Sequence, residues 1–484
     1  MPVSPLYRPE KIHADLGDEF FDIAAAADFP QRVLRHRDQR WAARVGLDTL
    51  APDEWTRHFG GFEPLPGNLR KPLALRYHGH QFRHYNQDLG DGRGFLFAQL
   101  RDAEDGRLLD LGTKGSGQTP WSRRGDGRLT LKGGVREVLA TETLEALGVY
   151  TSKSLSLIET GEDLVRGDEP SPTRSSVLVR LSHSHIRIGT FQRLAFFDDK
   201  ASMARLLDHC VAHYMPEIAA APAEKRAEEF LAEVCRRVAR LAAQWMAAGF
   251  VHGVLNSDNI NITGESFDYG PWRFAPHYDP AFTAAYFDEH GLYAFGRQPG
   301  ALAWNLTRLA ECLMAIAPKA GLEAALDAYE PVLQREFALA LLRRLGLAGA
   351  DQKADALLSK AVLEFLGATK APYEQFFFDW RGGLASEARA MAGPSAAFYR
   401  APEFAAARDA FGRRAPDPAA NLGHAYFQRE KPCSMLIEEV EAIWAPIAAR
   451  DDWSAFEAKL ADIGEMAQAY GARNQARGKF GVLC

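Results

Sequence analysis

The residues best suited to chemistry lie in short runs that are widely spaced along the chain. The first run, NQDLGDGRG, holds Gly90, Gly92 and Arg93 directly before an apolar segment. Glycines let a backbone approach phosphate groups closely, but an Asp-Gly turn in a β-hairpin has the same composition. Both interpretations stay open on these residues alone. A Rossmann fingerprint is disfavoured, because a strand and not a helix follows the glycines.

A lysine and a glutamate further along could act on the same ligand. Lys114 ends the strand-like run LLDLGTK, and Glu137 lies in the helix-like run that follows. A strand lysine held by a helix glutamate and directed at nucleotide phosphates is the arrangement of protein kinases. The basic loop between them contains Asp126 and Gly127 in a second glycine turn. A charge run is most often a solvated surface, but the glycines favour a backbone brought close to a ligand.

Two arginines bracket the run RLSHSHIR. Arg180 and Arg187 could clamp a terminal phosphate through forked, charge-assisted hydrogen bonds. A pair of ordinary surface arginines explains them equally well. In the strand-like run SVLVRL both faces carry apolar residues, so the alternation does not predict whether Arg180 is buried.

The run HGVLNSDNINITGESFDYG resembles the catalytic and metal-binding loops of kinases. His252 and Asn259 keep the offset of the kinase HRDxxxxN motif, and Asp268 opens DYG in place of DFG. Oxygen atoms of Asn259 and Asp268 are ligands that Mg²⁺ prefers beside nucleotide phosphates. Val254 stands where a kinase has its catalytic base, so the usual base for phosphoryl transfer is missing. Asp258 is the neighbouring carboxylate.

Composition limits the class of protein. The chain has 484 residues, 47% hydrophobic residues and a formal net charge of −6, which is typical of a folded protein and argues against broad nucleic-acid binding. No apolar run is long enough to span a bilayer, and the first residues lack the order of a secretory signal. The five cysteines are scattered without a CxxC pair, which favours a reducing cytoplasm and predicts no zinc site. They are Cys210, Cys235, Cys312, Cys433 and Cys484.

The elements that must position these residues change character along the chain. Strand-like runs GFLFAQL, RLLDLGTK, SKSLSLIET and SSVLVRL surround one amphipathic helix, predicted over 131–148, and alanine- and leucine-rich helices dominate after about 190. We therefore expect an α+β, protein-kinase-like fold of two lobes, with a β-rich nucleotide-binding N-lobe and a larger α-helical C-lobe. The expected boundaries are an irregular N-terminal wrapping segment at 1–70, the N-lobe at 71–195 and the C-lobe at 196–484, with its catalytic loop at 252–270.

The motifs together resemble a named family. The runs QDLGDGRG, KGSGQTPWSRRGDGR, VREVLATE, SHIRIGTFQ and HGVLNSDNINITGESFDYGP are similar to those of selenoprotein O, the YdiU-type protein adenylyltransferases, which are pseudokinases by motif. The similarity covers roughly residues 70 to 310, and the region after about 380 matches poorly. It implies transfer of AMP from ATP to Ser, Thr or Tyr hydroxyls of protein substrates, with ATP inverted relative to kinases and its α-phosphate exposed.

The resemblance also implies roles for individual residues. Asp258 would be the proton acceptor, and Asn259 and Asp268 would bind Mg²⁺, or alternatively Mn²⁺. Arg180 and Arg187 would hold the distal phosphate. The other residues implied to contact ATP or its phosphates are Gly90, Gly92, Arg93, Lys114, Asp126, Gly127 and Asp268, with Lys114 paired to Glu137. We expect a cytoplasmic monomer that binds neither nucleic acid nor membranes.

This chain departs from the family pattern at two places. Family members usually read GHQFG before the glycine run, whereas this chain has Arg83 and His84 after GHQF. Many bacterial members have a cysteine soon after DYG, but the matching run DPAFTAAYFD has none, which puts a family-type disulfide with Cys484 in doubt. Two rival functions stay open. One is an ordinary ATP-dependent protein kinase, and the other is a nucleotide-binding scaffold without catalytic activity.

Overall fold

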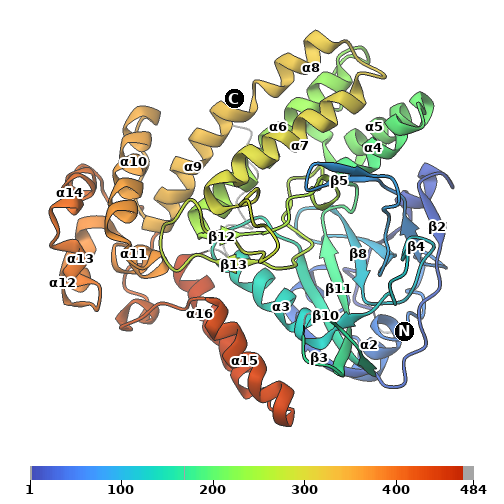
Figure 1. Cartoon of the computed structure of the whole chain (residues 1–484), viewed down its shortest axis with the longest axis horizontal. Helices are drawn as coiled ribbons and strands as arrows, with labels where there is room; N and C mark the ends of the chain where they lie inside the picture. Colours follow the sequence, from blue (N-terminus) through green and yellow to red (C-terminus); the bar gives the residue numbers. More distant parts are fainter. Residues whose placement is uncertain (1–2, 168, 472–484) are drawn as a thin grey trace.

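A computed structural model describes residues 3–167 and 169–471 of the chain (Figure 1). Its large sheet is built before residue 183, and most of its helices follow residue 187. The chain therefore has a mixed α/β architecture with a large antiparallel sheet and a helical part, as the composition of the runs predicts. Cys484 lies outside the described residues.

The large sheet joins nine strands of the described residues, all paired antiparallel. Along the sheet the order is β2 (Phe21–Ile23), β4 (Leu73–Leu75), β7 (Leu96–Arg101), β8 (Leu108–Lys114), β11 (Thr173–Ser182), β10 (Lys153–Leu164) and β3 (Val33–Arg37), with β1 (Pro9–Glu10) on β7 and β9 (Leu129–Thr130) on β11. The four predicted strands correspond to β7, β8, β10 and β11. The expected wrapping segment at 1–70 is more regular than its sequence suggests, because it supplies β1, β2 and β3.

Both faces of the sheet are buried, against different hydrophobic cores. On β11, Val177, Val179 and Leu181 face a core shared with the first 65 residues, whereas Leu178 faces a core shared with the helices. Alternation along the strand places Arg180 on the helical side with Leu178, and the residue is only 4% exposed. Arg180 is therefore buried, which the sequence pattern left undecided.

Helix α3 (Leu131–Ala146) crosses this helical side of the sheet. It begins where the Thr130 side chain accepts a hydrogen bond from the Gly133 amide at 3.1 Å, a standard N-cap. It ends near Gly148, whose φ of +81° suits glycine. A Cβ on Gly134 would lie 2.4 Å from Leu157 Cδ1 and 2.8 Å from Ser176 Oγ, so the helix needs glycine there to lie close to the sheet.

In Figure 1 most of the remaining helices lie above the sheet or to its left. Two short helices, α1 (Gln39–Arg44) and α2 (Pro52–Phe59), cover the other face of the sheet. The rest are α4 (Ile188–Phe196), α5 (Lys200–Tyr214), α6 (Arg226–Ala248), α7 (Gln298–Leu313), α8 (Lys319–Leu326), α9 (Tyr329–Leu345), α10 (Gln352–Thr369), α11 (Tyr373–Asp379), α12 (Glu387–Ala392), α13 (Ala396–Tyr399), α14 (Ala405–Gly412), α15 (Ile437–Arg450) and α16 (Ser454–Tyr470). Two small sheets pair β5 (Gly79–Gln81) with β6 (His84–Asn86) and β12 (Phe250–Val251) with β13 (Arg273–Phe274).

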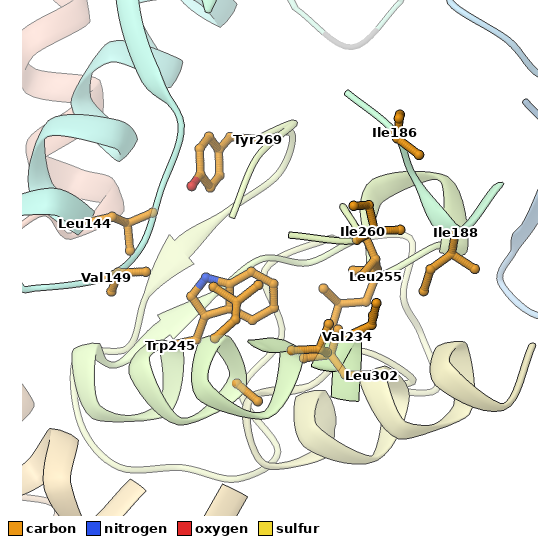
Figure 2. Close-up of a cluster of buried hydrophobic side chains, with 14 of the residues drawn as sticks. Leu144, Val149, Ile186, Ile188, Val234, Trp245, Leu255, Ile260, Tyr269 and Leu302 are labelled. Atoms are coloured by element: carbon orange, nitrogen blue, oxygen red, sulfur yellow. The ribbon is translucent and has the colours of Figure 1, made fainter. Parts of the chain in front are cut away.

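The segment between β12 and β13 is held by a hydrophobic cluster (Figure 2). Its side chains Leu255, Ile260 and Tyr269 pack with residues of α6 and α7, among them Trp245. Trp245 Nε1 also donates to Ser266 Oγ at 3.0 Å. These contacts fix the segment that carries the predicted catalytic loop.

The last helices return to α3. Helix α16 packs along α3, and its Ile463 and Met466 join the same core as Val138 and Leu139. The region after 380 therefore covers the face of α3 that does not contact the sheet.

Four cysteines are described, namely Cys210, Cys235, Cys312 and Cys433, and each is buried as a free thiol. Among the described residues, no helix combines the length and apolar character needed to cross a bilayer.

The close approach of α3 to the sheet yields a stability prediction. Gly134→Ala should lower the free energy of unfolding by about 1–3 kcal/mol, because the new methyl group overpacks the contact with Leu157. Gly300→Ala is the matched control, since Gly300 is exposed in α7 with no atom within 4 Å of an added Cβ. That change should stabilise the protein by up to ~1 kcal/mol through helix propensity. Urea unfolding would measure both, and equal effects at the two positions would contradict the steric argument.

Candidate active site

A cavity of about 710 Å³ lies where the helical side of the sheet meets the segment between β12 and β13. It brings together nearly all the site residues predicted from the sequence. Its lining includes Gly90, Gly92, Arg93, Lys114, Asp126, Gly127, Arg180, Arg187, Asp258, Asn259 and Asp268. Glu137 is the remaining predicted residue, and it contacts the lining residue Lys114.

The glycine-rich run forms one wall of the cavity. It is not a β-hairpin, because β6 pairs with β5 whereas β7 pairs with β1, β4 and β8. Gly90 and Gly92 do not adopt a positive φ, so left-handed backbone is not the reason for glycine here. A Cβ on Gly90 would lie 2.4 Å from Trp121 Cγ, and one on Gly92 would lie 2.9 Å from the Trp121 carbonyl oxygen. The glycines allow close packing of this run against the loop at 119–125.

Lys114 is the last residue of β8, and its side chain is 4% exposed. Its ammonium group forms an ion pair with Glu137 of α3. It also lies 3.2 Å from Asp268 Oδ1 and donates to the Tyr269 carbonyl oxygen at 3.3 Å. The lysine thus connects the sheet, α3 and the DYG segment at one point.

Asp268 occupies the centre of a cationic cluster. Besides Lys114, the Arg180 guanidinium donates to Asp268 Oδ1 at 3.1 Å. Burial alone would raise the pKa of Asp268, but the positive charges of Lys114, Arg180, Arg187 and Arg93 outweigh it and hold that pKa well below 3.8. Asp268 has a φ of +61°, which is uncommon for a residue other than glycine. Its carboxylate is therefore held ionised in a strained backbone position.

Arg187 is buried at the base of the cavity and is 3% exposed. Its guanidinium pairs with Asp91 Oδ1 at 3.1 Å and donates to the Asp258 carbonyl oxygen at 3.2 Å. The guanidinium carbon also lies 4.2 Å from the centre of the Tyr77 ring. Sequence reasoning missed Asp91 as a partner, although it stands between two glycines of the run LGDGRG.

Asp258 lies in a short 3₁₀ turn, Ser257–Asn259, and is 7% exposed. Its Oδ1 atom is buried without a hydrogen-bond partner among the described residues. The carboxylate packs against β5, where a Cβ on Gly79 would lie 2.8 Å from that same oxygen. Burial raises the pKa of Asp258 from 3.8 to about 7, although the charge of Arg187 opposes the shift. A carboxylate with such a pKa can accept a proton near neutral pH.

The other motif residues hold the loop in shape. His252 is fully buried, with Nε2 2.9 Å from the Phe267 carbonyl oxygen and its amide donating to Gln298 Oε1. Asn259 Nδ2 donates to the Val254 carbonyl oxygen at 3.0 Å, so the side-chain amide oxygen of Asn259 points away from Val254. Val254 lines the cavity, and the position of the kinase base is therefore occupied by an apolar side chain.

Asp126 and Gly127 line the outer part of the cavity. Asp126 is exposed and pairs with Arg166 at 2.8 Å. Gly127 has a φ of +70°, and a Cβ there would lie 2.2 Å from the backbone of Gly117. Glycine is required here because the backbone at 127 passes close to the backbone at 117. This close approach places Asp126 and Gly127 at the cavity.

The donor set for a metal ion is small. Within the described ranges, no three His, Cys, Asp or Glu side chains are grouped to hold a metal ion. Asn259 and Asp268 nevertheless line the same cavity, and they offer one amide oxygen and one carboxylate. Magnesium is commonly bound by one or two carboxylates together with substrate phosphates and water, so this pair fits such an ion beside a nucleotide.

Comparisons with known proteins show the family to which the chain belongs. The family model described as "Protein adenylyltransferase SelO" matches residues 7–463. The chain is 44% identical over 459 residues to "Protein nucleotidyltransferase YdiU" of Synechocystis sp., covering 91% of this chain and 94% of that protein. Proteins of the same description from Gloeobacter violaceus and Trichormus variabilis are 46% and 51% identical, covering 92% and 75% of this chain and 93% and 74% of those proteins. The limit of the resemblance to about 70–310, with a poor match after 380, is therefore wrong.

Replacing either aspartate with neutral asparagine should change the stability of the fold, in opposite directions for Asp258 and Asp268. Asp258 has a raised pKa, so its ionisation costs stability as the pH rises from about 4 to about 7. Asp258→Asn should raise the free energy of unfolding by about 2–4 kcal/mol above pH 7, since one pKa unit corresponds to about 1.4 kcal/mol. This gain should vanish near pH 4, where the carboxyl group is protonated in both the folded and the unfolded state.

Asp268→Asn should behave in the opposite way and serves as the control. Because the pKa of Asp268 is depressed, its ionised carboxylate stabilises the folded state above about pH 4. This contribution is lost as the pH falls through the depressed pKa. The substitution should cost about 3–5 kcal/mol at neutral pH, because it removes the partner of buried cations. Urea unfolding followed by circular dichroism at several pH values would measure both. A pH-independent effect of Asp258→Asn would contradict the assignment.

Proposed function

Because the chain belongs to the protein adenylyltransferase SelO family, we propose that it transfers AMP from Mg-ATP to serine, threonine or tyrosine hydroxyls of other proteins and releases pyrophosphate. The chain is an enzyme of the nucleotidyltransferase class, with a nucleotide and a protein as substrates. One observation carries the finer proposal. The buried carboxylate of Asp258 has an oxygen without a hydrogen-bond partner in the described part of the chain, and it lies in the same cavity as Lys114, Arg180 and Arg187.

We also infer the two-lobed fold of protein kinases. The support comes from the order of elements around the cavity. A glycine-rich loop precedes β7, Lys114 ends β8, Glu137 projects from α3, and the loops with Asn259 and Asp268 follow a long helix, α6. This is the order of the nucleotide-binding parts in kinases.

The distribution of cations supports an inverted nucleotide. Arg180 and Arg187 are 4% and 3% exposed, whereas Arg93 is exposed at the cavity edge. The most buried guanidinium groups suit the most highly charged end of the triphosphate, which would then lie deep in the cavity. The α-phosphate would lie nearer the acceptor, and a base at Val254 would serve no purpose.

In the proposed reaction the acceptor hydroxyl oxygen forms a bond to the α-phosphorus, and the bond from that phosphorus to the oxygen bridging to the β-phosphate breaks. The hydroxyl proton passes to Asp258, whose pKa of about 7 suits a base at neutral pH. Pyrophosphate carries away the electron pair of the broken bond. Lys114, Arg180 and Arg187 stabilise the negative charge that accumulates on it.

Asn259 and Asp268 would hold Mg²⁺, with Mn²⁺ as the alternative. When bound, such an ion neutralises phosphate charge and acts as a Lewis acid. Asp268 is held ionised by the surrounding cations, so it can serve as a ligand across the physiological pH range.

The first test concerns which phosphate moves. Incubation with Mg-ATP labelled at the α position should label protein substrates or the enzyme itself, and intact mass should show a gain of AMP. Label arriving only from the γ position would identify a protein kinase. Nucleotide binding without any transfer would identify an inactive scaffold.

A second test concerns Asp258. Asp258→Asn should reduce the rate of AMP transfer by about 10²–10⁴-fold, the usual contribution of a general base, while ATP still binds. Lys114→Ala should instead weaken ATP binding, because it removes a phosphate ligand. Circular dichroism would verify that both variants fold, and full activity of Asp258→Asn would exclude its role as base.

A third test concerns the metal. Asn259→Ala should raise the Mg²⁺ concentration that gives half-maximal transfer at least several-fold, because one of two protein ligands is lost. Chelation of divalent ions should abolish transfer by the unmodified enzyme. An unchanged Mg²⁺ dependence in Asn259→Ala would remove that residue from the metal site.

A further inference from the structure

A second hollow, of about 730 Å³, adjoins the cavity of the candidate active site, which we call the nucleotide cavity. The second hollow has no part in the mechanism above. It lies between Asp88, just after β6, and the loop at 120–125. The two spaces share the part of that loop from Trp121 to Gly125. We call this space the outer hollow.

The loop that separates the two spaces is firmly held. Thr119 Oγ1 donates to the Asp91 carbonyl oxygen at 2.5 Å, and the Gly125 amide donates to the Ser122 carbonyl oxygen at 2.7 Å. The Trp121 indole packs on Gly90, and its Nε1 donates to Asp22 Oδ2 at 2.9 Å. The backbone that carries Arg123 and Arg124 is therefore held in place from both sides.

Two of those side chains are arginines without a carboxylate partner. Arg123 and Arg124 are exposed, and neither forms a salt bridge with any residue in 3–167 or 169–471. In contrast, nearby Arg128 pairs with Glu162 at 2.8 Å, and Arg166 pairs with Asp126 at 2.8 Å. Of the described residues that line the outer hollow, Asp88 alone carries a carboxylate. The hollow thus offers, against one carboxylate, two guanidinium groups that form no salt bridge with the described residues.

The outer hollow shares Arg123 with the cavity that Asp258 lines. Arg123 and Asp258 both line the nucleotide cavity, and the positive charge of Arg123 acts on the Asp258 carboxylate. A polypeptide lying in the outer hollow could therefore present its next residue to Asp258. Arg123 has a φ of +56°, so its backbone is held in an uncommon conformation beside this path.

We propose that the outer hollow receives the acceptor segment of the protein substrate, and that Arg123 and Arg124 bind carboxylates adjacent to the hydroxyl that is modified. Arginine binds carboxylates through two parallel hydrogen bonds, which fixes orientation as well as position. This inference rests on the proposed function and adds a preference for hydroxyls flanked by Asp or Glu. Phosphates of ATP are the other ligands that these arginines could bind, and the test below separates the two.

The test uses two fluorescent peptides that share a central serine, one flanked by aspartates and the other by asparagines. Fluorescence anisotropy would measure their binding to the full-length protein, and α-labelled ATP would measure AMP transfer and the KM values for peptide and for ATP. The variants are Arg123→Gln with Arg124→Gln, and Arg83→Gln as the matched control. Arg83 is likewise an exposed arginine with positive φ and no salt bridge among the described residues, but it lines neither space.

The unmodified protein and the Arg83→Gln control should bind the aspartate peptide at least tenfold more tightly than the asparagine peptide. The double variant should lose this preference and raise the KM for the peptide, with the KM for ATP unchanged. Equal binding of the two peptides, a double variant that affects only the KM for ATP, or displacement of the peptide by a single-stranded oligonucleotide of equal charge would overturn the inference. A retained acidic preference without AMP transfer would instead count against the proposed function.

Discussion

The structure depends on keeping one buried ammonium group satisfied. Lys114 is almost fully buried, and a buried ammonium group is costly unless carboxylates compensate its charge. Its partners Glu137 and Asp268 come from α3 and from the DYG segment, so sheet, helix and loop must meet at one point. Removing one partner of a buried pair typically costs about 3–5 kcal/mol, more than most single contacts contribute. The close packing of α3 at Gly134 and its cover by α16 both serve to hold Glu137 at this point.

The same cavity shifts the pKa values of two aspartates in opposite directions. Asp258 is buried and Asp268 is partly buried in the site, but cations surround Asp268 while one oxygen of Asp258 has no partner among the described residues. The result is one carboxylate that stays ionised and another whose pKa is about 7. Such a separation between neighbouring acids is how proteins assign a charge-binding role to one and a proton-accepting role to the other.

Local sequence patterns predicted the parts of the site, but not the contacts that unite them. The strands that carry Lys114 and Arg180 and the helix that carries Glu137 follow from hydrophobic periodicity. Burial of Arg180 could not be predicted, because apolar residues on both faces of β11 reflect two cores that only the folded chain reveals. The pairing of Arg187 with Asp91, and the contribution of β1 to β3 from the first residues, are also long-range. Contacts between residues far apart in sequence leave no periodic signal for a single sequence to show.

Burial divides the arginines around the cavity into two groups with different uses. Arg180 and Arg187 lie deep and each has a carboxylate partner, Asp268 or Asp91, because a guanidinium group removed from water requires compensation. Arg123 and Arg124 remain in water and need no partner for the fold to be stable. A ligand for the deep group must therefore offer more negative charge than the carboxylates it competes with, which a triphosphate does. A ligand for the outer group need carry only one or two carboxylates, as an acidic polypeptide segment does. Both kinds of ligand would meet at Asp258, a buried acid whose pKa lies near neutrality.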